Sequence, residues 1–186
     1  MHSKADSQKE SNPPTIWTIG HSSRPLEVFL ALLKGPGIEY VADVRRYPGS
    51  RAHPQFNQGE LSRSLIDTGM RYFAFPELGG RRTPSPASKH TIWEHAAFRA
   101  YADYMDTAEF RAGLERLAQI ACEGKTAMMC AETLWWRCHR SMIADALKAD
   151  GFRVLHIMDG AIVSNHPYTS AARIVDGKLH YGAGSA

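Results

Sequence analysis

The sequence has little cysteine and no long apolar segment. Three cysteines among 186 residues are an odd and small number, which argues against a disulfide framework and favours a reducing compartment. No run approaches the roughly 20 consecutive apolar residues that a membrane-spanning helix requires. Residues 1–14 are polar and lack the apolar core of a secretory signal. We therefore expect a cytoplasmic protein with no membrane contact.

Neither sign of charge dominates, and no known cofactor fingerprint is present. The formal net charge is only +3, which permits an anionic ligand without demanding nucleic acid, since no dense basic run exists. The glycine patterns G-x-G-x-x-G and G-x-x-x-x-G-K-[ST], which cradle phosphates in dinucleotide and nucleoside triphosphate sites, are also missing. We expect no cofactor.

The apolar pattern predicts strands that alternate with helices. Five β-prone runs are expected, at residues 16–19, 39–44, 72–75, 126–131 and 153–157. Apolar residues at helical spacing predict helices at 25–33, 57–66, 107–121 and 139–149. This order predicts a three-layer α/β fold, with a mostly parallel sheet of about five strands and helices on both faces.

The same pattern divides the chain into three parts. Residues 1–14 are expected to form a disordered lead-in, 15–160 a single α/β domain, and 161–186 a weakly patterned C-terminal surface segment. Within the domain, residues 77–98 contain two adjacent glycines, two adjacent arginines and two prolines. We expect an irregular excursion there, and long excursions in compact domains are often functional.

Polar residues follow four of the predicted strands. His21 and Ser22 follow the first, and Asp43 and Arg45 stand at the end of the second. The stretch "CAETLWWRCHRS" at residues 130–141 follows the fourth, and "MDG" follows the fifth. Ligands of parallel sheets bind beyond the carboxyl ends of the strands, where the loops converge. We therefore expect a shared pocket at this edge.

These residues also carry a family resemblance. The stretches are "TIGHS", "VADVRRYPGS", "ELGG" and "CAETLWWRCHRSMIADAL". With them, residues 15–160 resemble the domain-of-unknown-function 488 family of bacterial and archaeal proteins. The resemblance implies an α/β domain with a polar site built from these motifs, and it implies no particular activity.

Glu132 is the favoured general acid or base. It comes directly after a buried strand, where acid-base carboxylates are often found. The alternative is a salt bridge from Glu132 to Arg137 or Arg140. Asp43 and His139 are candidates to assist in proton transfer, and Asp43 alternatively orients Arg45 or His21.

The cysteines leave several interpretations open. Cys130 is a candidate nucleophile, but a small apolar residue is also common at a buried strand end. Cys130, Cys138 and His139 offer ligand types that suit zinc. Against zinc, adjacent Cys138 and His139 would have difficulty in reaching one ion together.

The remaining candidates would bind the substrate. Arg45 and Arg140 are expected to clamp a phosphate or carboxylate, with Arg137 nearby. His21 and Ser22 either position the substrate or cap the next helix.

Trp135 and Trp136 offer a face for stacking a base or sugar, although neighbouring aromatics more often cover a core. Arg81 and Arg82 either form a cationic lid or are simply solvated.

These observations favour an enzyme, a hydrolase or group transferase, that acts on an anionic small molecule, nucleotide or nucleic-acid fragment. One alternative is a nucleic-acid-binding module without catalysis. Another is a zinc-binding or redox-sensing domain built on Cys130, Cys138 and His139. The sequence does not define the oligomeric state.

Overall fold

The structure is a computed structural model in which residues 12–182 are described. Most of the polar lead-in expected at residues 1–14 lies outside this range. No helix among the described residues is long and apolar enough to cross a membrane.

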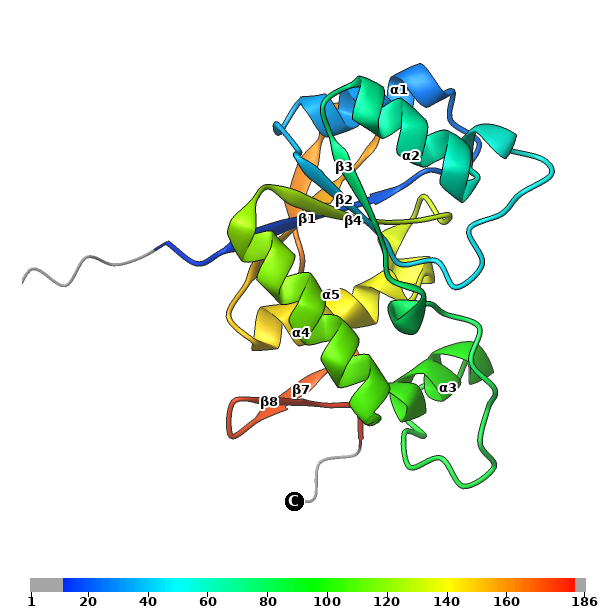
Figure 1. Ribbon diagram of the computed structural model, residues 1–186. Helices are drawn as coiled ribbons and strands as arrows, with labels where there is room; N and C mark the ends of the chain where they lie inside the picture. The colour runs from blue at the N-terminus through cyan, green and yellow to red at the C-terminus, as the bar shows by residue number, and fades with distance from the viewer. Residues whose placement is uncertain (1–11, 183–186) are drawn as a thin grey trace, which may run out of the picture.

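A six-stranded sheet forms the centre of the molecule (Figure 1). Its strand order is β3-β2-β4-β1-β5-β6; the first five strands are parallel, and β6 runs antiparallel to β5. The strands are β1 (Thr15–Gly20), β2 (Tyr40–Asp43), β3 (Arg71–Ala74), β4 (Thr126–Cys130), β5 (Arg153–Ile157) and β6 (Val163–Asn165). The predicted mostly parallel sheet is confirmed, with β6 as an additional edge strand.

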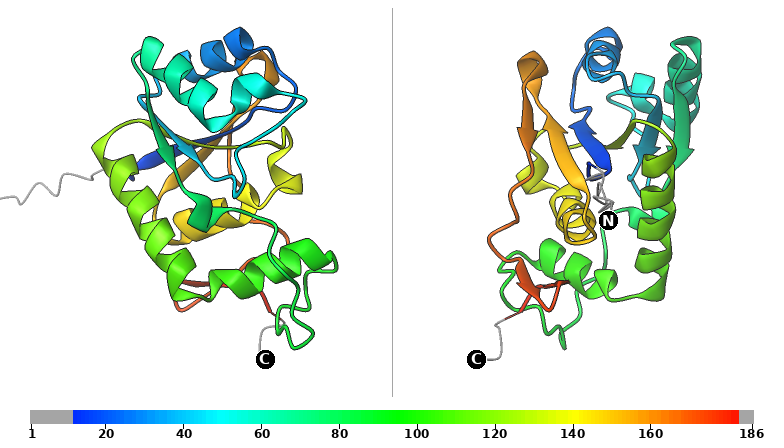
Figure 2. Two further views of the ribbon diagram at one scale, coloured as in Figure 1. Left: turned by 45° about the vertical axis from the view of Figure 1, so that its right-hand side comes forward. Right: turned by 90° about the vertical axis from the view of Figure 1, so that its left-hand side faces the viewer.

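Helices cover both faces of the sheet, as Figures 1 and 2 show. One face packs against α1 and α2 through Phe29, Leu61 and Leu65, and the other packs against α4 and α5 through Leu117 and Leu147. The helices are α1 (Leu26–Lys34), α2 (Gln58–Asp67), α3 (Ala96–Met105), α4 (Ala108–Glu123) and α5 (Arg140–Ala149). The three-layer α/β prediction is therefore confirmed.

The position of the central strand β4 accounts for a crevice at the carboxyl ends of the parallel strands. All five of its residues are buried, because layers cover both of its faces and a continuous apolar run is what such a strand requires. The helices that follow its neighbours β1 and β2 pack on one face, whereas α5, which follows β4, packs on the other. Connections that diverge in this way leave space beyond the carboxyl ends of the strands.

Glycine allows two of these connections to come together. β1 ends at Gly20, and a Cβ there would lie 1.8 Å from the carbonyl oxygen of Glu132. Only a residue without a side chain permits this approach. The glycine of "TIGHS" therefore lets the loop after β4 pack directly on the end of β1.

The predicted irregular excursion at residues 77–98 ends earlier than expected, and helix α3 follows it. No helix was predicted over Ala96–Met105, which is a correction. Phe98, Tyr101, Ala102 and Met105 stand at helical spacing, so the sequence does carry a signal for this helix. The omission matters because α3 forms one wall of the pocket described below.

The C-terminal residues are partly buried. β6 joins the main sheet, and β7 (Arg173–Val175) and β8 (Lys178–His180) form a separate hairpin. His166 and Tyr181 are buried, so this segment contributes polar groups to the interior as well as surface.

Candidate functional site

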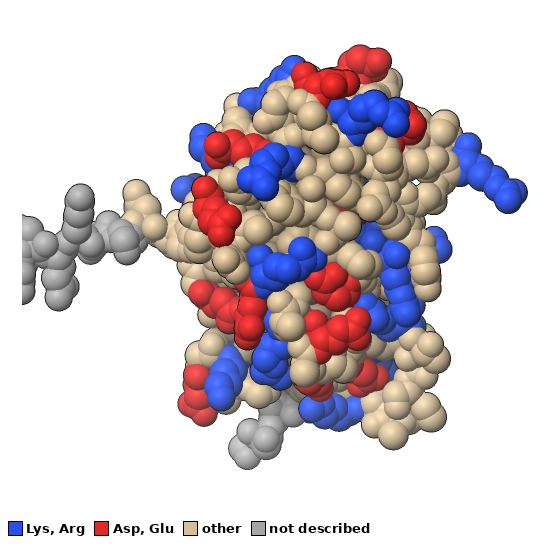
Figure 3. Space-filling view, in the orientation of Figure 1, with Lys and Arg blue, Asp and Glu red and all other residues tan. Residues whose placement is uncertain are grey.

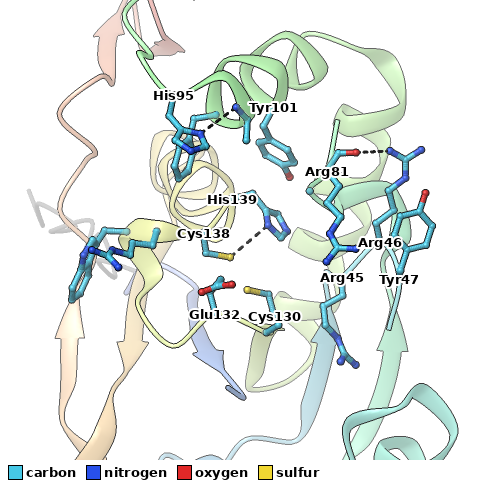
Figure 4. A pocket seen from close by; sticks show the side chains of 16 residues that line it. Arg45, Arg46, Tyr47, Arg81, His95, Tyr101, Cys130, Glu132, Cys138 and His139 are labelled. Carbon is cyan, nitrogen blue, oxygen red and sulfur yellow. Dashed lines mark hydrogen bonds between the residues drawn. The ribbon is translucent and has the colours of Figure 1, made fainter. Parts of the chain in front are cut away.

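A cavity of about 600 Å³ lies beyond the carboxyl ends of β2 and β4. Three connections and one helix line it: the loop after β2, the loop that follows β3, the long turn after β4, and α3. Figure 4 shows this pocket, with side chains from these separate segments directed toward one space. Its size is that of a small-molecule site.

Two thiols and an imidazole form the floor of the pocket. Cys130 ends β4, and Cys138 and His139 stand immediately before α5. The Sγ atoms of the two cysteines and a ring nitrogen of His139 all lie within 4.8 Å of one another. In Figure 4 these three side chains and Glu132 meet at the centre of the cavity.

The tautomer of His139 follows from its partners. Nε2 lies 3.0 Å from the carbonyl oxygen of Val44, which can only accept, so Nε2 carries the proton. Nδ1 is then an acceptor and lies 3.5 Å from Sγ of Cys138. Burial lowers the pKa of His139, so the ring faces the thiol as a neutral imidazole.

Arg140 lies beneath the two thiols and is only 1% exposed. Its guanidinium donates to the carbonyl oxygens of Glu132 and Thr133 and to Oγ1 of Thr18. No carboxylate pairs with it among residues 12–182, and its Nε has no hydrogen-bond partner there. A buried cation is costly without a counter-charge, and a thiolate beside it would supply one.

The two thiols differ in acidity. Burial would raise the pKa of Cys138, but a hydrogen bond from Cys130 and the charge of Arg140 together lower it to about 7. The backbone N–H of Arg140, at the start of α5, acts in the same direction. Burial raises the pKa of Cys130 well above its ordinary value. Cys138, rather than the predicted Cys130, is therefore the candidate thiolate.

Arginines surround the mouth of the pocket. Arg46, Arg81 and Arg137 all line it. Arg46 donates to the carbonyl oxygen of Arg81 at 3.0 Å. Within the part of the chain that the structure describes, the side chains of Arg81 and Arg137 form neither hydrogen bonds nor ion pairs. They are therefore available to an anionic ligand.

Glu132 is the acidic residue that lines this pocket. It is exposed, and neither Arg137 nor Arg140 forms the alternative salt bridge with its carboxylate. Arg140 instead binds the main-chain carbonyl of Glu132. The carboxylate remains accessible to a bound molecule.

The two residues of the predicted clamp are placed differently, because Arg45 lines the pocket whereas Arg140 is not among the lining residues. Arg45 is buried and lies 2.8 and 2.6 Å from the two carboxylate oxygens of Asp43, and it also reaches His21 and the carbonyl of Phe56. Because both guanidinium groups are bound to protein partners, neither offers a free pair of N–H donors for a bidentate contact with a ligand. The sequence placed Arg45 after a strand and Arg140 at the start of a helix, as the structure has them, but it could not show that partners within the protein already bind both side chains.

His21, Ser22 and Trp135 lie outside the pocket lining. His21 stacks on Phe56 with ring centroids 4.2 Å apart, and its Nδ1 lies 2.8 Å from the carbonyl of Ser22. Trp135 stacks on His156 at 4.2 Å. Both rings thus pack against protein partners, and it is the adjacent Trp136 that lines the pocket, with 50% of its surface exposed.

Sequence reasoning did not assign a role to several lining residues. Tyr47, His95, Phe98 and Tyr101 contribute to the walls, and the helical spacing in α3 was the available signal for the last two.

Acidic and basic side chains are interspersed over the face drawn in Figure 3. The cationic character therefore belongs to the pocket and is not a broad property of that face.

The fold and site define an α/β protein with a thiol-containing, arginine-rimmed pocket. The chain belongs to the family described as "Domain of unknown function DUF488", which matches residues 25–147, about two thirds of its length. The predicted family resemblance is thus confirmed; "TIGHS" precedes the matched region. No curated protein and no solved structure matches the chain.

Proposed function

We propose that the protein is an enzyme that hydrolyses or transfers a group on an anionic substrate, with Cys138 as its nucleophile. The observation that carries the proposal is the buried Arg140 guanidinium, which has no carboxylate partner among the described residues and lies against the thiols at the floor of the cavity. A thiolate is both the missing counter-charge and the reactive form of cysteine.

Three arginines support an anionic substrate. Arg46, Arg81 and Arg137 line a cavity of about 600 Å³, and guanidinium groups bind phosphate and carboxylate in a bidentate manner. Tyr47 and Trp136, with 62% and 50% of their surface exposed, offer aromatic faces on which a base could stack. A nucleotide-sized molecule satisfies both features.

The reaction would use the floor residues in two steps. The Cys138 thiolate attacks an electrophilic phosphorus or acyl carbon, and the leaving group departs with the bonding electrons and takes a proton from solvent. Glu132 then removes a proton from a water or acceptor hydroxyl, which attacks the same centre and releases the thiolate. Cys130 stabilises the thiolate through its hydrogen bond.

The proposal requires reduced cysteines. All three cysteines are free, and a reducing cytosol keeps them so. The chemistry needs no cofactor, because the nucleophile and the base both come from the chain.

Alkylation of the thiol tests the proposal without a known substrate. In a Cys122→Ser background, which removes the exposed cysteine, we expect iodoacetamide to modify Cys138 with an apparent pKa near 7. We expect the arginines to raise the rate of alkylation by anionic iodoacetate relative to the rate with neutral iodoacetamide. Arg137→Gln should reduce this rate ratio by about fivefold, equivalent to roughly 1 kcal/mol of charge interaction.

The matched control is Arg63→Gln. Arg63 lies on α2 in an exposed pair with Glu60 and does not line the pocket, so the same loss of charge should leave the reagent ratio unchanged. Cys138→Ser should abolish modification. An apparent pKa near 9, or equal effects of the two arginine variants, would contradict the proposal.

Once a substrate that the protein converts is identified, Glu132→Gln tests the role of Glu132 as the general base. Among substrates, phosphate and carboxylate esters are the first to screen. Unchanged turnover in Glu132→Gln would remove that carboxylate from the reaction.

Zinc binding is the second candidate function, and one distance favours it. Tetrahedral zinc with ordinary Zn–S and Zn–N bonds separates a sulfur from a nitrogen ligand by about 3.6 Å. Sγ of Cys138 and Nδ1 of His139 are 3.5 Å apart, so adjacency does not prevent the two from reaching one ion. The Nε2–H bond to Val44 is the kind of outer contact that zinc-bound histidines make.

Metal analysis separates the two candidates. Protein purified without chelator and holding less than about one-tenth equivalent of zinc excludes a structural metal role. One equivalent that is lost in Cys130→Ser would favour the zinc site over the free thiolate.

A nucleic-acid-binding module without catalysis remains a third hypothesis, motivated by the arginines and exposed aromatics. Nucleic-acid binding weakens steeply as salt is raised. Affinity that ignores salt concentration would exclude it.

A further inference from the structure

Two loops each bring an arginine next to an aromatic residue, and both pairs line the pocket. Arg46 and Tyr47 follow β2, and Trp136 and Arg137 belong to the turn after β4. An arginine beside an exposed ring is the combination that a nucleotide requires, because the guanidinium binds the phosphate and the base stacks on the ring. The pocket therefore contains this combination twice.

The two pairs lie on opposite sides of the pocket floor. β4, which ends at the floor, stands between β2 and β1 in the sheet. The first pair is on the β2 side, where Arg46 donates to the carbonyl oxygen of Arg81 in the loop after β3 (Figure 4). The turn after β4 lies instead over β1 and β5, because Trp135 stacks on His156 of β5 with ring centroids 4.2 Å apart. A ligand that contacts both pairs must therefore cross the floor.

The loop after β3 holds the first pair in place. A Cβ at Gly79 would lie 2.5 Å from the backbone nitrogen of Arg46, so glycine lets the two loops pack directly together. Arg81 has a left-handed backbone with a φ of 59°, which is uncommon for a residue other than glycine. Its carbonyl oxygen accepts from Nη1 of Arg46 at 3.0 Å, and the same guanidinium lies 5.6 Å from the centroid of the Tyr47 ring. The guanidinium of this wall is thus already oriented before a ligand arrives.

The second pair is supported by an aromatic stack. The Trp135 ring lies parallel to that of His156, with an interplanar angle of 2°, and it meets the Trp136 ring edge-on at 5.4 Å. Trp136 is therefore anchored on one edge while half of its surface stays exposed. Among residues 12–182, no ring stacks face to face on Trp136 or on Tyr47. Both rings can accept a flat group of a ligand.

The charges between the two walls favour a ligand with more than one phosphate. Arg46, Arg81 and Arg137 line the pocket together with one unpaired carboxylate, that of Glu132. Arg45 adds no free charge, because a buried aspartate already pairs with it. Three guanidinium groups against one carboxylate leave two positive charges in excess, which matches a ligand that carries a phosphate for each base.

We propose that the pocket binds two adjacent nucleotides of a single strand, with one base stacked on Tyr47, the other on Trp136, and the linking phosphodiester above the floor. Bases stack on protein rings in this way only when they are unpaired, so the ligand is single-stranded. This inference rests on the proposed function and narrows its substrate class from an anionic molecule to a dinucleotide segment.

Calorimetric titration with three defined probes tests the inference. The probes are the 5′-phosphorylated dinucleotide of deoxyadenosine, the same dinucleotide with one base missing, and deoxyadenosine 5′-monophosphate. The titrations use Cys138→Ser, which lacks the proposed nucleophile, so binding is measured without turnover and without a thiolate or a metal held by Cys138. If this variant does not fold, the parent protein takes its place.

We expect the dinucleotide to bind about tenfold more tightly than the mononucleotide, which is the size of effect that one further base stack produces. The probe with one base missing should lose most of that gain. Tyr47→Ala and Trp136→Ala should each weaken dinucleotide binding about tenfold. Each should weaken mononucleotide binding by no more than about twofold, because a single base occupies one wall at a time and the other wall remains.

Tyr168→Ala is the matched control. Tyr168 lies outside the pocket lining and has the Lys148 ammonium 4.5 Å from its ring centroid, so the loss of this aromatic ring should leave all three affinities unchanged. Tyr47 and Trp136 are at least half exposed, and their replacement should leave the melting temperature nearly unchanged. A loss of affinity in those two variants then reports on the ligand rather than on stability.

A dinucleotide that binds no more tightly than the mononucleotide overturns the inference, and so does a loss confined to one of the two aromatic variants. Neither result bears on the proposed function, which alkylation of the parent protein tests. Dinucleotide binding through both rings in a protein whose thiol has ordinary reactivity would contradict the proposed catalysis and support the two-nucleotide pocket.

Discussion

Arg45, in the loop after β2, and Arg140, at the start of α5, are both buried arginines, yet their surroundings differ. Arg45 is paired with Asp43 through two oxygens and stands beside His21. Arg140 has neutral oxygens and two thiols around it, and its carboxylate, Asp145, is four hydrogen bonds away. The first charge is neutralised by its carboxylate, whereas the second has no carboxylate in contact and would stabilise a neighbouring thiolate under the proposed function. The comparison therefore predicts that Arg45 contributes mainly to stability and Arg140 mainly to the reactivity of the thiol.

Replacing Arg45 should have the largest effect on stability. Arg45→Met leaves the Asp43 carboxylate buried without its cation, a change that costs about 3–5 kcal/mol. Urea denaturation at pH 7 measures this loss. The thiol profile of any folded fraction should be unchanged, and a parallel loss of Cys138 reactivity would show that the two regions are not independent.

The two regions should lose stability in different pH ranges. The pKa of Cys138 is lowered from 9.0 to about 7, so its contribution is complete above pH 9 and is lost as pH falls through 7, in total roughly 2–3 kcal/mol. Burial, offset in part by a hydrogen bond to Ser22, lowers the pKa of His21 from 6.5 to about 4. Its contribution is complete above pH 6.5 and is lost as pH falls through 4.

Unfolding free energies measured from pH 4 to pH 9.5 check this separation. Cys138→Ser should flatten the curve between pH 7 and 9 and leave the acid limb unchanged. His21→Gln should reduce only the loss of unfolding free energy at acid pH. The lowered pKa of His156 also contributes to that loss. A single shared transition in both variants would contradict two separate regions.

Replacing Arg140 should affect reactivity more than stability. Arg140→Met removes the charge next to Cys138, so we expect the alkylation rate at pH 7 to fall about ten- to hundredfold as the thiol pKa returns toward its ordinary value. No carboxylate in direct contact loses its partner, so stability should fall by less than in Arg45→Met. Equal rates in the parent and Arg140→Met would show that another group activates the thiol.

Tyr72→Phe should have the smallest effect. Its hydroxyl donates to Asp43 at 2.7 Å, and a single hydrogen bond of this kind contributes about 1 kcal/mol. Denaturation should show that small loss with no change in Cys138 alkylation. A loss as large as that of Arg45→Met would mean that Tyr72, rather than Arg45, stabilises the carboxylate.

The predicted fold depended on local signals, and most of these were sufficient. The apolar run of β4, Thr126–Cys130, predicted a strand buried on both faces because such a strand contacts helices above and below. Thr107 predicted the start of α4, where its side chain accepts from the N–H of Phe110. Helix α3 was missed although its spacing was regular, because the surrounding residues favoured a loop.

The candidate site could be predicted only in part. The sequence alone determined the order of strands and helices and placed Cys130, Glu132, Cys138 and His139 near one strand end, because those properties follow from hydrophobic period and neighbouring positions. The sequence did not determine which of the candidate side chains are bound to partners within the protein.

Tertiary structure alone decided that Arg45 has a carboxylate against it while Arg140 has thiols, and that Thr18, His156 and His166 stand in line between Arg140 and Asp145. Charge and hydrogen bonding act over a few ångströms, and residues up to 138 positions apart in the chain reach that distance only after the sheet and its two helical layers have assembled.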